Sequence, residues 1–223
     1  MSNKPNGAEA ESPAPQKSQA RELGEALLIA FILAMLIRTF VIQAFKIPSG
    51  SMKDTLLIGD HLLVSKFSYG IHIPNEIPFW GVQLFPDYIF FQKVPERGDI
   101  IVFKYPRDPQ KDFIKRVIGL PGDTLEIIRQ RVYINGELMA DPYAHHTVLP
   151  GLDPVQGRDY YGPTRVPEGH LFMMGDNREN SSDSRVWGFL DINMIRGKAQ
   201  MIYWSWDSSD TSLRWRRLGN FIH

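Results

Sequence analysis

A serine in a tight loop and a lysine in an apolar strand are the two residues of this 223-residue chain best suited to chemistry. Ser51 lies in the run IPSGSM at 47–52, in which Pro48 and Gly50 predict a tight turn that can present a hydroxyl. Such a hydroxyl becomes a nucleophile only when a base takes its proton. Taken alone, a Ser-Gly-Ser run is usually just a loop.

The lysine lies in the run FIKRVIGLPGD at 113–123. Strand alternation places Phe113, Lys115 and Val117 on one face and Arg116 on the other. Apolar neighbours strip water from an amine and lower its pKa, whereas an exposed lysine titrates near ~10.4, so that only about one in 2,500 is neutral at pH 7. Lys115 is therefore a candidate general base, although a lysine at the rim of an edge strand would give the same pattern.

A polar run, GDNRENSSDSR at 175–185, follows an apolar strand. It is either a solvated loop or a buried hydrogen-bonding network that fixes a site. The Asp183 and Arg185 pair favours the network.

Other chemistries find no support. The chain has no cysteine, no HExxH motif, no G-x-S-x-G elbow, no S-x-x-K box and no Gly-rich phosphate loop. The adjacent pair His145-His146 has no ligand pattern near it. Twenty-five basic residues balance twenty-five acidic ones, which gives no support for a nucleic-acid partner. We expect neither a metal nor a cofactor.

The N-terminal part predicts an anchor. Residues 1–22 are rich in Ser, Pro, Ala and Gln and predict a disordered tail. Residues 23–45 are apolar enough, and long enough for a core of ~30 Å, to predict one transmembrane helix. A buried core helix and a cleaved signal sequence are the alternatives. No small-x-small site follows the run and no polar stripe divides it, which disfavours both.

Short runs rich in Val, Ile, Phe and Tyr follow, separated by Gly and Pro. They predict strands at 61–67, 99–105, 113–118, 124–128, 131–134, 171–174 and 199–206, and Asn135-Gly136 predicts a hairpin turn. The expected fold is mostly β: an antiparallel β domain from 46–125 and 167–223, with a smaller inserted hairpin and loop-rich lobe at 126–166. Residues 71–94 are aromatic and rich in Pro, which fits either a loop on the bilayer interface or a local mini-core.

The three segments, with GDIIVFKYP at 98–106, resemble the ordered boxes of bacterial type I signal peptidases: IPSGSM at 47–52, KRVIGLPGD at 115–123 and GDNRENSSDSRVWG at 175–188. The similarity runs from about residue 38 to the C-terminus, with variable stretches at 71–94 and 140–165. Departures are small: Glu179, Val186 and Phe113 replace residues that are common in the family. The resemblance implies a mostly antiparallel β fold and a Ser/Lys dyad serine protease.

The resemblance also implies roles for single residues. Ser51 matches the nucleophile and Lys115 the base, while Ser49 matches a donor to the oxyanion alongside the Ser51 backbone N–H. Ser181 matches the hydroxyl that orients the lysine. Asp183, Arg185 and Arg116 match a supporting ion network, in which we expect Arg116 to pair with Asp183.

Substrates and location follow by the same resemblance. Such enzymes cut secretory preproteins after small residues at the first and third positions before the scissile bond. Candidate pocket walls are Phe45, Ile47, Leu56 and Ile114, although core packing explains each equally well. The implied location is the bacterial inner membrane, single-pass, with the catalytic domain on the outer, periplasmic face. Charge bias around the apolar run leaves orientation almost undetermined.

Two other functions fit the same residues. One is a non-catalytic, membrane-tethered binding module on the same scaffold, which would be expected to lose Ser51 or Lys115. The other is a dedicated or self-cleaving processing peptidase of the same mechanism.

Overall fold

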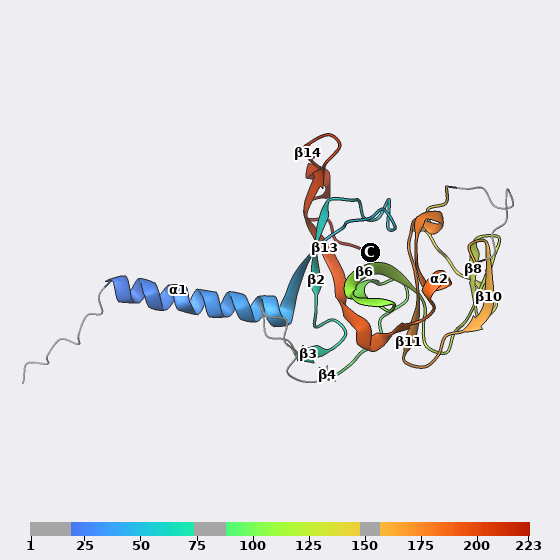
Figure 1. Cartoon of the computed structure of the whole chain (residues 1–223), viewed down its shortest axis with the longest axis horizontal. Helices are drawn as coiled ribbons and strands as arrows, with labels where there is room; N and C mark the ends of the chain where they lie inside the picture. The colour runs from blue at the N-terminus through green and yellow to red at the C-terminus, as the bar shows by residue number, and fades with distance from the viewer. Residues whose placement is uncertain (1–18, 74–87, 148–156) are drawn as a thin grey trace, which may run out of the picture. The chain divides into compact units, whose positions relative to one another are not determined.

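The computed structural model describes residues 19–73, 88–147 and 157–223, and it divides into two compact units, Met1–Ile37 and Arg38–His223. Figure 1 labels the main elements. The expected tail lies mostly outside the described residues, as do residues 74–87 of the aromatic stretch.

The helix of the first unit is shorter than predicted. Helix α1 spans Gln19–Leu36, and a π-helical turn, Ile37–Val41, follows it. Residues Ile42–Lys46 then form strand β1, so the predicted helical end at 45 is wrong. Strand β1 pairs antiparallel with β2, Asp60–Ser65. Its five residues are too few for their periodicity to distinguish a helix from a strand in the sequence. No helix among the described residues has the length and apolar character needed to span a membrane.

The second unit is built on an antiparallel sheet whose strand order is β1-β2-β13-β5-β6-β11-β12, with β14 paired to β13. Its further strands are β5 Ile100–Tyr105, β6 Asp108–Gly119, β11 His170–Met174, β12 Leu190–Asp191, β13 Ile195–Asp207 and β14 Ser212–Leu213.

A second antiparallel sheet has the order β10-β7-β8-β9. Its strands are β7 Thr124–Ile128, β8 Arg131–Ile134, β9 Glu137–Leu138 and β10 Tyr160–Arg165. Asn135 and Gly136 join β8 to β9 with φ of 54° and 85°, as a type I′ turn requires. A two-stranded sheet pairs β3 Ile71–Ile73 with β4 Tyr88–Phe90.

Short helices complete the described part of the chain: α2 Ser184–Trp187 and the 3₁₀ turns Arg178–Asn180, Ile192–Met194 and Trp215–Arg217. Each of the seven predicted strand segments overlaps an observed strand, so the mostly β prediction is confirmed.

Strand β6 contributes to all three buried apolar clusters. Ile114 belongs to the first, Val117 to the second and Ile118 to the third. The two basic residues between them, Lys115 and Arg116, are therefore held on a strand packed from several sides. A buried strand of this kind is strongly specified in register.

Candidate active site

The amine of Lys115 and the hydroxyl of Ser51 are in hydrogen-bond contact. Lys115 Nζ lies 2.7 Å from Ser51 Oγ and 2.9 Å from the carbonyl oxygen of Ile114. The Lys115 side chain is buried at 3% exposure, and the Phe113 ring centroid lies 5.4 Å from Nζ. Two residues 64 positions apart in the sequence are thus brought to the distance that proton transfer requires.

Burial lowers the pKa of Lys115 from 10.5 to about 8, because loss of hydration disfavours the ammonium form. The carboxylates of Asp183 and Asp176 act in the opposite direction and raise that pKa. Desolvation outweighs both carboxylates, so a useful fraction of the amine is neutral near pH 7.

The turn that carries Ser51 is fixed from within and from outside. Lys53 N donates to Gly50 O at 3.0 Å, and the buried Met52 anchors the turn in the first apolar cluster. From outside, Asn177 N donates to Ser51 O at 3.1 Å and Asn177 Nδ2 donates to Gly50 O at 2.9 Å. Asn177 stands in the polar run, but no local pattern predicts this particular contact.

The partner of Arg116 is Asp176, and the predicted pairing with Asp183 is wrong. Arg116 Nε and Nη2 donate to the two Asp176 oxygens at 2.9 and 2.7 Å, and both side chains are almost fully buried. Arg116 faces Met174 in the β6–β11 register, and Asp176 follows two residues later. Asp183 instead accepts from the guanidinium of Arg185 at 2.8 Å.

Asp183 and Asp176 also organise the neighbouring backbone. Asp183 caps α2 by accepting from the Arg185 N–H, and it accepts from Gly175 N at 3.1 Å. Asp176 accepts from Thr55 Oγ1 at 2.6 Å, which connects it to the turn that carries the serine. Both carboxylates therefore join the polar run to the strands and turn beside the dyad.

Two predicted hydroxyl roles find no contact in the structure. Ser181 Oγ is buried and has no hydrogen-bond partner, so it does not bond Lys115 here. A Cβ added at Gly175 would lie 2.6 Å from Ser181 Cβ and 2.5 Å from Ser51 O, so Gly175 is packed against both serines. Ser49 is exposed and makes no side-chain hydrogen bond within the described part of the chain.

The four candidate pocket residues belong to the first apolar cluster. Ile47, Leu56 and Ile114 are buried members of it, and Phe45 packs against it half-buried. Leu56 has no exposed surface. The structure thus brings the four together while leaving core packing as a sufficient reason for Leu56.

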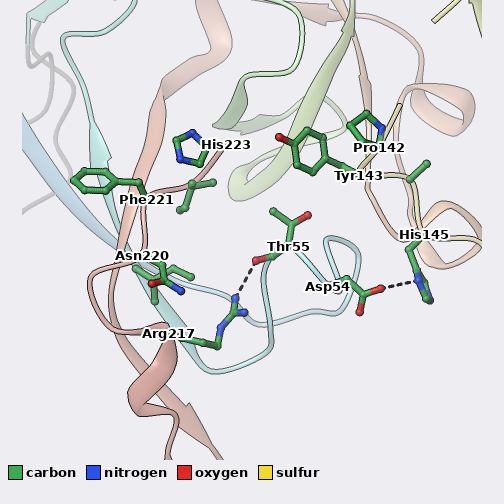
Figure 2. A pocket seen from close by; sticks show the side chains of 12 residues that line it. Asp54, Thr55, Pro142, Tyr143, His145, Arg217, Asn220, Phe221 and His223 are labelled. Carbon is green, nitrogen blue, oxygen red and sulfur yellow. Dashed lines mark hydrogen bonds and ion pairs between the residues drawn. The ribbon is translucent and has the colours of Figure 1, made fainter. Parts of the chain in front are cut away.

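A pocket of about 430 Å³ lies elsewhere on the second unit, and neither Ser51 nor Lys115 lines it. Figure 2 shows its lining, which includes Asp54, Tyr143, His145 and Arg217. The Tyr143 ring lies 3.9 Å from the guanidinium carbon of Arg116. The described residues hold no cluster of three or more His, Cys, Asp or Glu side chains suited to a metal ion.

Comparisons with known proteins identify the family of this chain. The family model described as signal peptidase, peptidase S26, matches residues 20–204. The signal peptidase I of Pseudomonas aeruginosa is 36% identical over 223 residues, covering 83% of this chain and 72% of that protein. The probable signal peptidase I-2 of Synechocystis is 37% identical, covering 85% and 76%. The signal peptidase I of Rickettsia bellii is 35% identical, covering 86% and 77%. The chain therefore belongs to the signal peptidase family, peptidase S26.

Proposed function

We propose that the signal peptidase activity of this chain uses Ser51 as nucleophile and Lys115 as general base. The observation that carries the proposal is the 2.7 Å contact between Ser51 Oγ and Lys115 Nζ inside a buried site. When the amine is neutral, the same contact allows the hydroxyl to donate its proton to the nitrogen lone pair. Both reactive groups are present and in contact, which argues against a non-catalytic module.

The reaction proceeds in two halves. Ser51 Oγ attacks the carbonyl carbon of the scissile peptide bond while Lys115 Nζ takes its proton. The resulting ammonium returns the proton to the departing amine, which leaves an acyl-enzyme on Ser51. Lys115, neutral again, then takes a proton from the water that attacks this ester. As the bond between Ser51 Oγ and the acyl carbon breaks, the ammonium returns that proton to Ser51 Oγ, which releases the acid product and regenerates both groups.

The oxyanion formed in each half is assigned to the Ser51 backbone N–H and the Ser49 hydroxyl. The exposure of Ser49 leaves its hydroxyl accessible to a bound substrate. Loss of one such donor typically costs ~3–4 kcal/mol of barrier lowering, so Ser49→Ala is expected to slow turnover without abolishing it. The buried, unpartnered Ser181 hydroxyl is assigned to the ammonium form of Lys115.

Three further residues support the dyad indirectly, through the polar run 175–185. Arg116, Asp183 and Arg185 are buried or nearly so, and every one is paired with an opposite charge. Their role is to hold the polar run 175–185 against the dyad.

Preproteins are the substrates of a signal peptidase. We assign the preference for small residues before the cleavage site to a shallow apolar pocket walled by Phe45, Ile47 and Ile114 and backed by Leu56. Support comes from their common cluster and from Ile114 adjoining Lys115. An Ile114→Ala variant is expected to accept a larger residue at one of the two positions, as measured by cleavage of a preprotein series.

The proposed location is the bacterial inner membrane, with the chain single-pass and its catalytic domain on the outer face. Support comes from α1, on which eight large apolar side chains are exposed: Leu23, Leu27, Leu28, Ile29, Phe31, Ile32, Leu33 and Leu36. Recovery of the chain in the membrane fraction after alkaline extraction tests the attachment.

For the domain division, we assign 46–125 with 167–223 to the catalytic domain and 126–166 to an inserted lobe. The second sheet supports this, since its strands fall between Thr124 and Arg165.

The deciding experiment measures cleavage of a labelled preprotein in detergent by Ser51→Ala, Lys115→Ala and Lys111→Ala. Lys111 shares strand β6 with Lys115 but is exposed, so its variant is the matched control. We expect the first two to lose activity and the control to keep it. Near-normal cleavage by Lys115→Ala would refute the dyad.

A further inference from the structure

His145, in the segment 141–147, is hydrogen-bonded to the polar run through its backbone. His145 N donates to Asp176 O at 2.8 Å, and Arg178 N donates to His145 O at 3.1 Å. His145 therefore pairs with Asn177 like two residues of adjacent parallel strands. Asn177 is the residue that bonds the backbone of the Ser51 turn.

The side chain of His145 reaches the same turn from the other end. His145 Nδ1 lies 2.6 Å from Asp54 Oδ2, as the dashed line in Figure 2 shows. Asp54 follows Ser51 by three residues and has a φ of 77°, in the left-handed region that non-glycine residues rarely adopt. A backbone in this region persists only where surrounding contacts hold it.

We propose that Asp54 and His145 are a positioning pair for the nucleophile. Contacts run in a closed ring: Asn177 holds Gly50 and Ser51, His145 is bonded to both neighbours of Asn177, and its imidazole holds Asp54. The turn 50–54 is thus held at its start by Asn177 and at its end by His145, and these two residues are themselves paired. This fixes the direction in which the Ser51 hydroxyl points toward Lys115.

A second pair keeps the gripping segment rigid. His146 Nδ1 lies 2.9 Å from Glu179 Oε1, and Thr147 N donates to Glu179 Oε2 at 2.9 Å. Burial acts to raise the Glu179 pKa, but these bonds together outweigh it and hold that pKa below its usual range. His145 therefore projects from a segment that is fixed on both sides, as a positioning residue requires.

This inference rests on the proposed role of Ser51, and it makes a kinetic prediction. A nucleophile turned away from its base reacts slowly even though substrate still binds, because small misplacements in a site cost large factors in rate. We expect His145→Ala and Asp54→Ala each to lower kcat about tenfold and to leave KM within about twofold.

The test measures kcat and KM on a short peptide substrate with the full chain in detergent, for Asp54→Ala, His145→Ala, the double variant and Asp54→Asn. Alanine at 54 also disturbs the left-handed backbone, so the double variant separates the two causes. If the pair acts as a unit, the double variant is no slower than the worse single one. Asn tolerates the same backbone and accepts a hydrogen bond from Nδ1, so Asp54→Asn is expected to recover kcat to within about threefold of the parent.

His170→Ala is the matched control, because among the described residues the His170 ring bonds the nearby Glu168 O and no group of the site. It is expected to leave kcat unchanged. Unchanged kcat in His145→Ala, additive losses in the double variant, or no rescue by Asp54→Asn would each overturn the proposal. Ser51→Ala is run beside them. Residual activity in that variant would count against the dyad itself, whereas an inactive Ser51→Ala with an unaffected His145→Ala would count against the positioning pair alone.

Discussion

The guanidinium of Arg116 and the carboxylate of Asp176 form a two-bond ion pair with almost no exposed surface, one residue along β6 from the dyad lysine. Such a pair contributes modestly when intact, but removal of one partner leaves an uncompensated buried charge. Asp176 also accepts from Thr55 beside the serine turn. The ion pair therefore connects strand β6 to the turn that carries Ser51.

Removal of the Asp176 carboxylate should consequently destabilise the fold. We expect Asp176→Ala to cost ~3–5 kcal/mol of unfolding free energy and to lower Tm by roughly 10 °C, as measured by thermal denaturation. The exposed ion pair between Lys111 and Asp108 provides the contrast, and Asp108→Ala is expected to leave Tm unchanged. Equal effects of the two substitutions would contradict the assigned importance of burial.

The pH dependence of cleavage should follow the Lys115 amine. Since burial lowers its pKa to about 8, roughly one amine in ten is neutral at pH 7. We expect kcat/KM to rise about tenfold per pH unit below pH 7 and to level off above pH 8. A peptide cleavage assay from pH 5 to pH 10 measures this, and a profile that is flat below pH 8 would exclude the amine as the base.

The same shift has a consequence for stability. Because the folded-state pKa lies below the value of 10.5 in the unfolded chain, the unfolded chain binds the proton more tightly. Wild-type stability should therefore rise by about 3 kcal/mol as pH increases from 8 to 10.5, and the penalty is fully present below pH 8. Lys115→Met removes that penalty but also loses the bonds to Ser51 and Ile114.

We accordingly expect inactive Lys115→Met to unfold at a higher temperature than wild type at pH 6 and at a lower one at pH 10. Denaturation curves at the two pH values show the crossover. A variant less stable at both would mean that the lysine is not desolvated as its burial indicates.

A side chain at position 175 is expected to clash with the turn that carries Ser51. An alanine Cβ there would lie 2.5 Å from the carbonyl oxygen of Ser51 and 2.6 Å from Ser181 Cβ, so the serine turn would have to move. We expect Gly175→Ala to cost ~1–3 kcal/mol in unfolding free energy and more than ~100-fold in kcat. Gly50→Ala is the control for stability, because its Cβ meets no atom within 4 Å. Full activity in Gly175→Ala would show that the turn tolerates displacement.

Local pattern was enough to predict most of the fold, whereas the dyad was predicted only through the family resemblance. Alternation placed Lys115 and Arg116 on opposite faces, and Asn135-Gly136 marked its turn. The end of the first helix was not predicted, because residues 42–46 are too few for their periodicity to distinguish a helix from a strand, and they form a strand by pairing with β2. That pairing depends on residues some twenty positions away.

The supporting shell was predicted in kind but not in detail. Asp176 and Asp183 stand in one polar run, and only the β6–β11 register decides which of them meets Arg116. His145 lies in a stretch without a recognisable pattern, so nothing local indicated that it would contact Asp54. The six residues between the two aspartates include the Arg178–Asn180 turn, which no periodicity in the sequence predicts.

Strand β6 carries two adjacent basic residues with opposite requirements. Lys115 must lose its proton to act as a base, whereas Arg116 always keeps its charge. Lys115 and Arg116 would exchange places if the strand slipped by one residue, since every side chain would then change face. The face on which Lys115 lies therefore depends on the register of β6, which starts at the β5–β6 turn, where Tyr105 pairs with Asp108. A one-residue insertion or deletion that shifts the register of β6 from this turn onward would leave the strands paired but turn Lys115 away from Ser51.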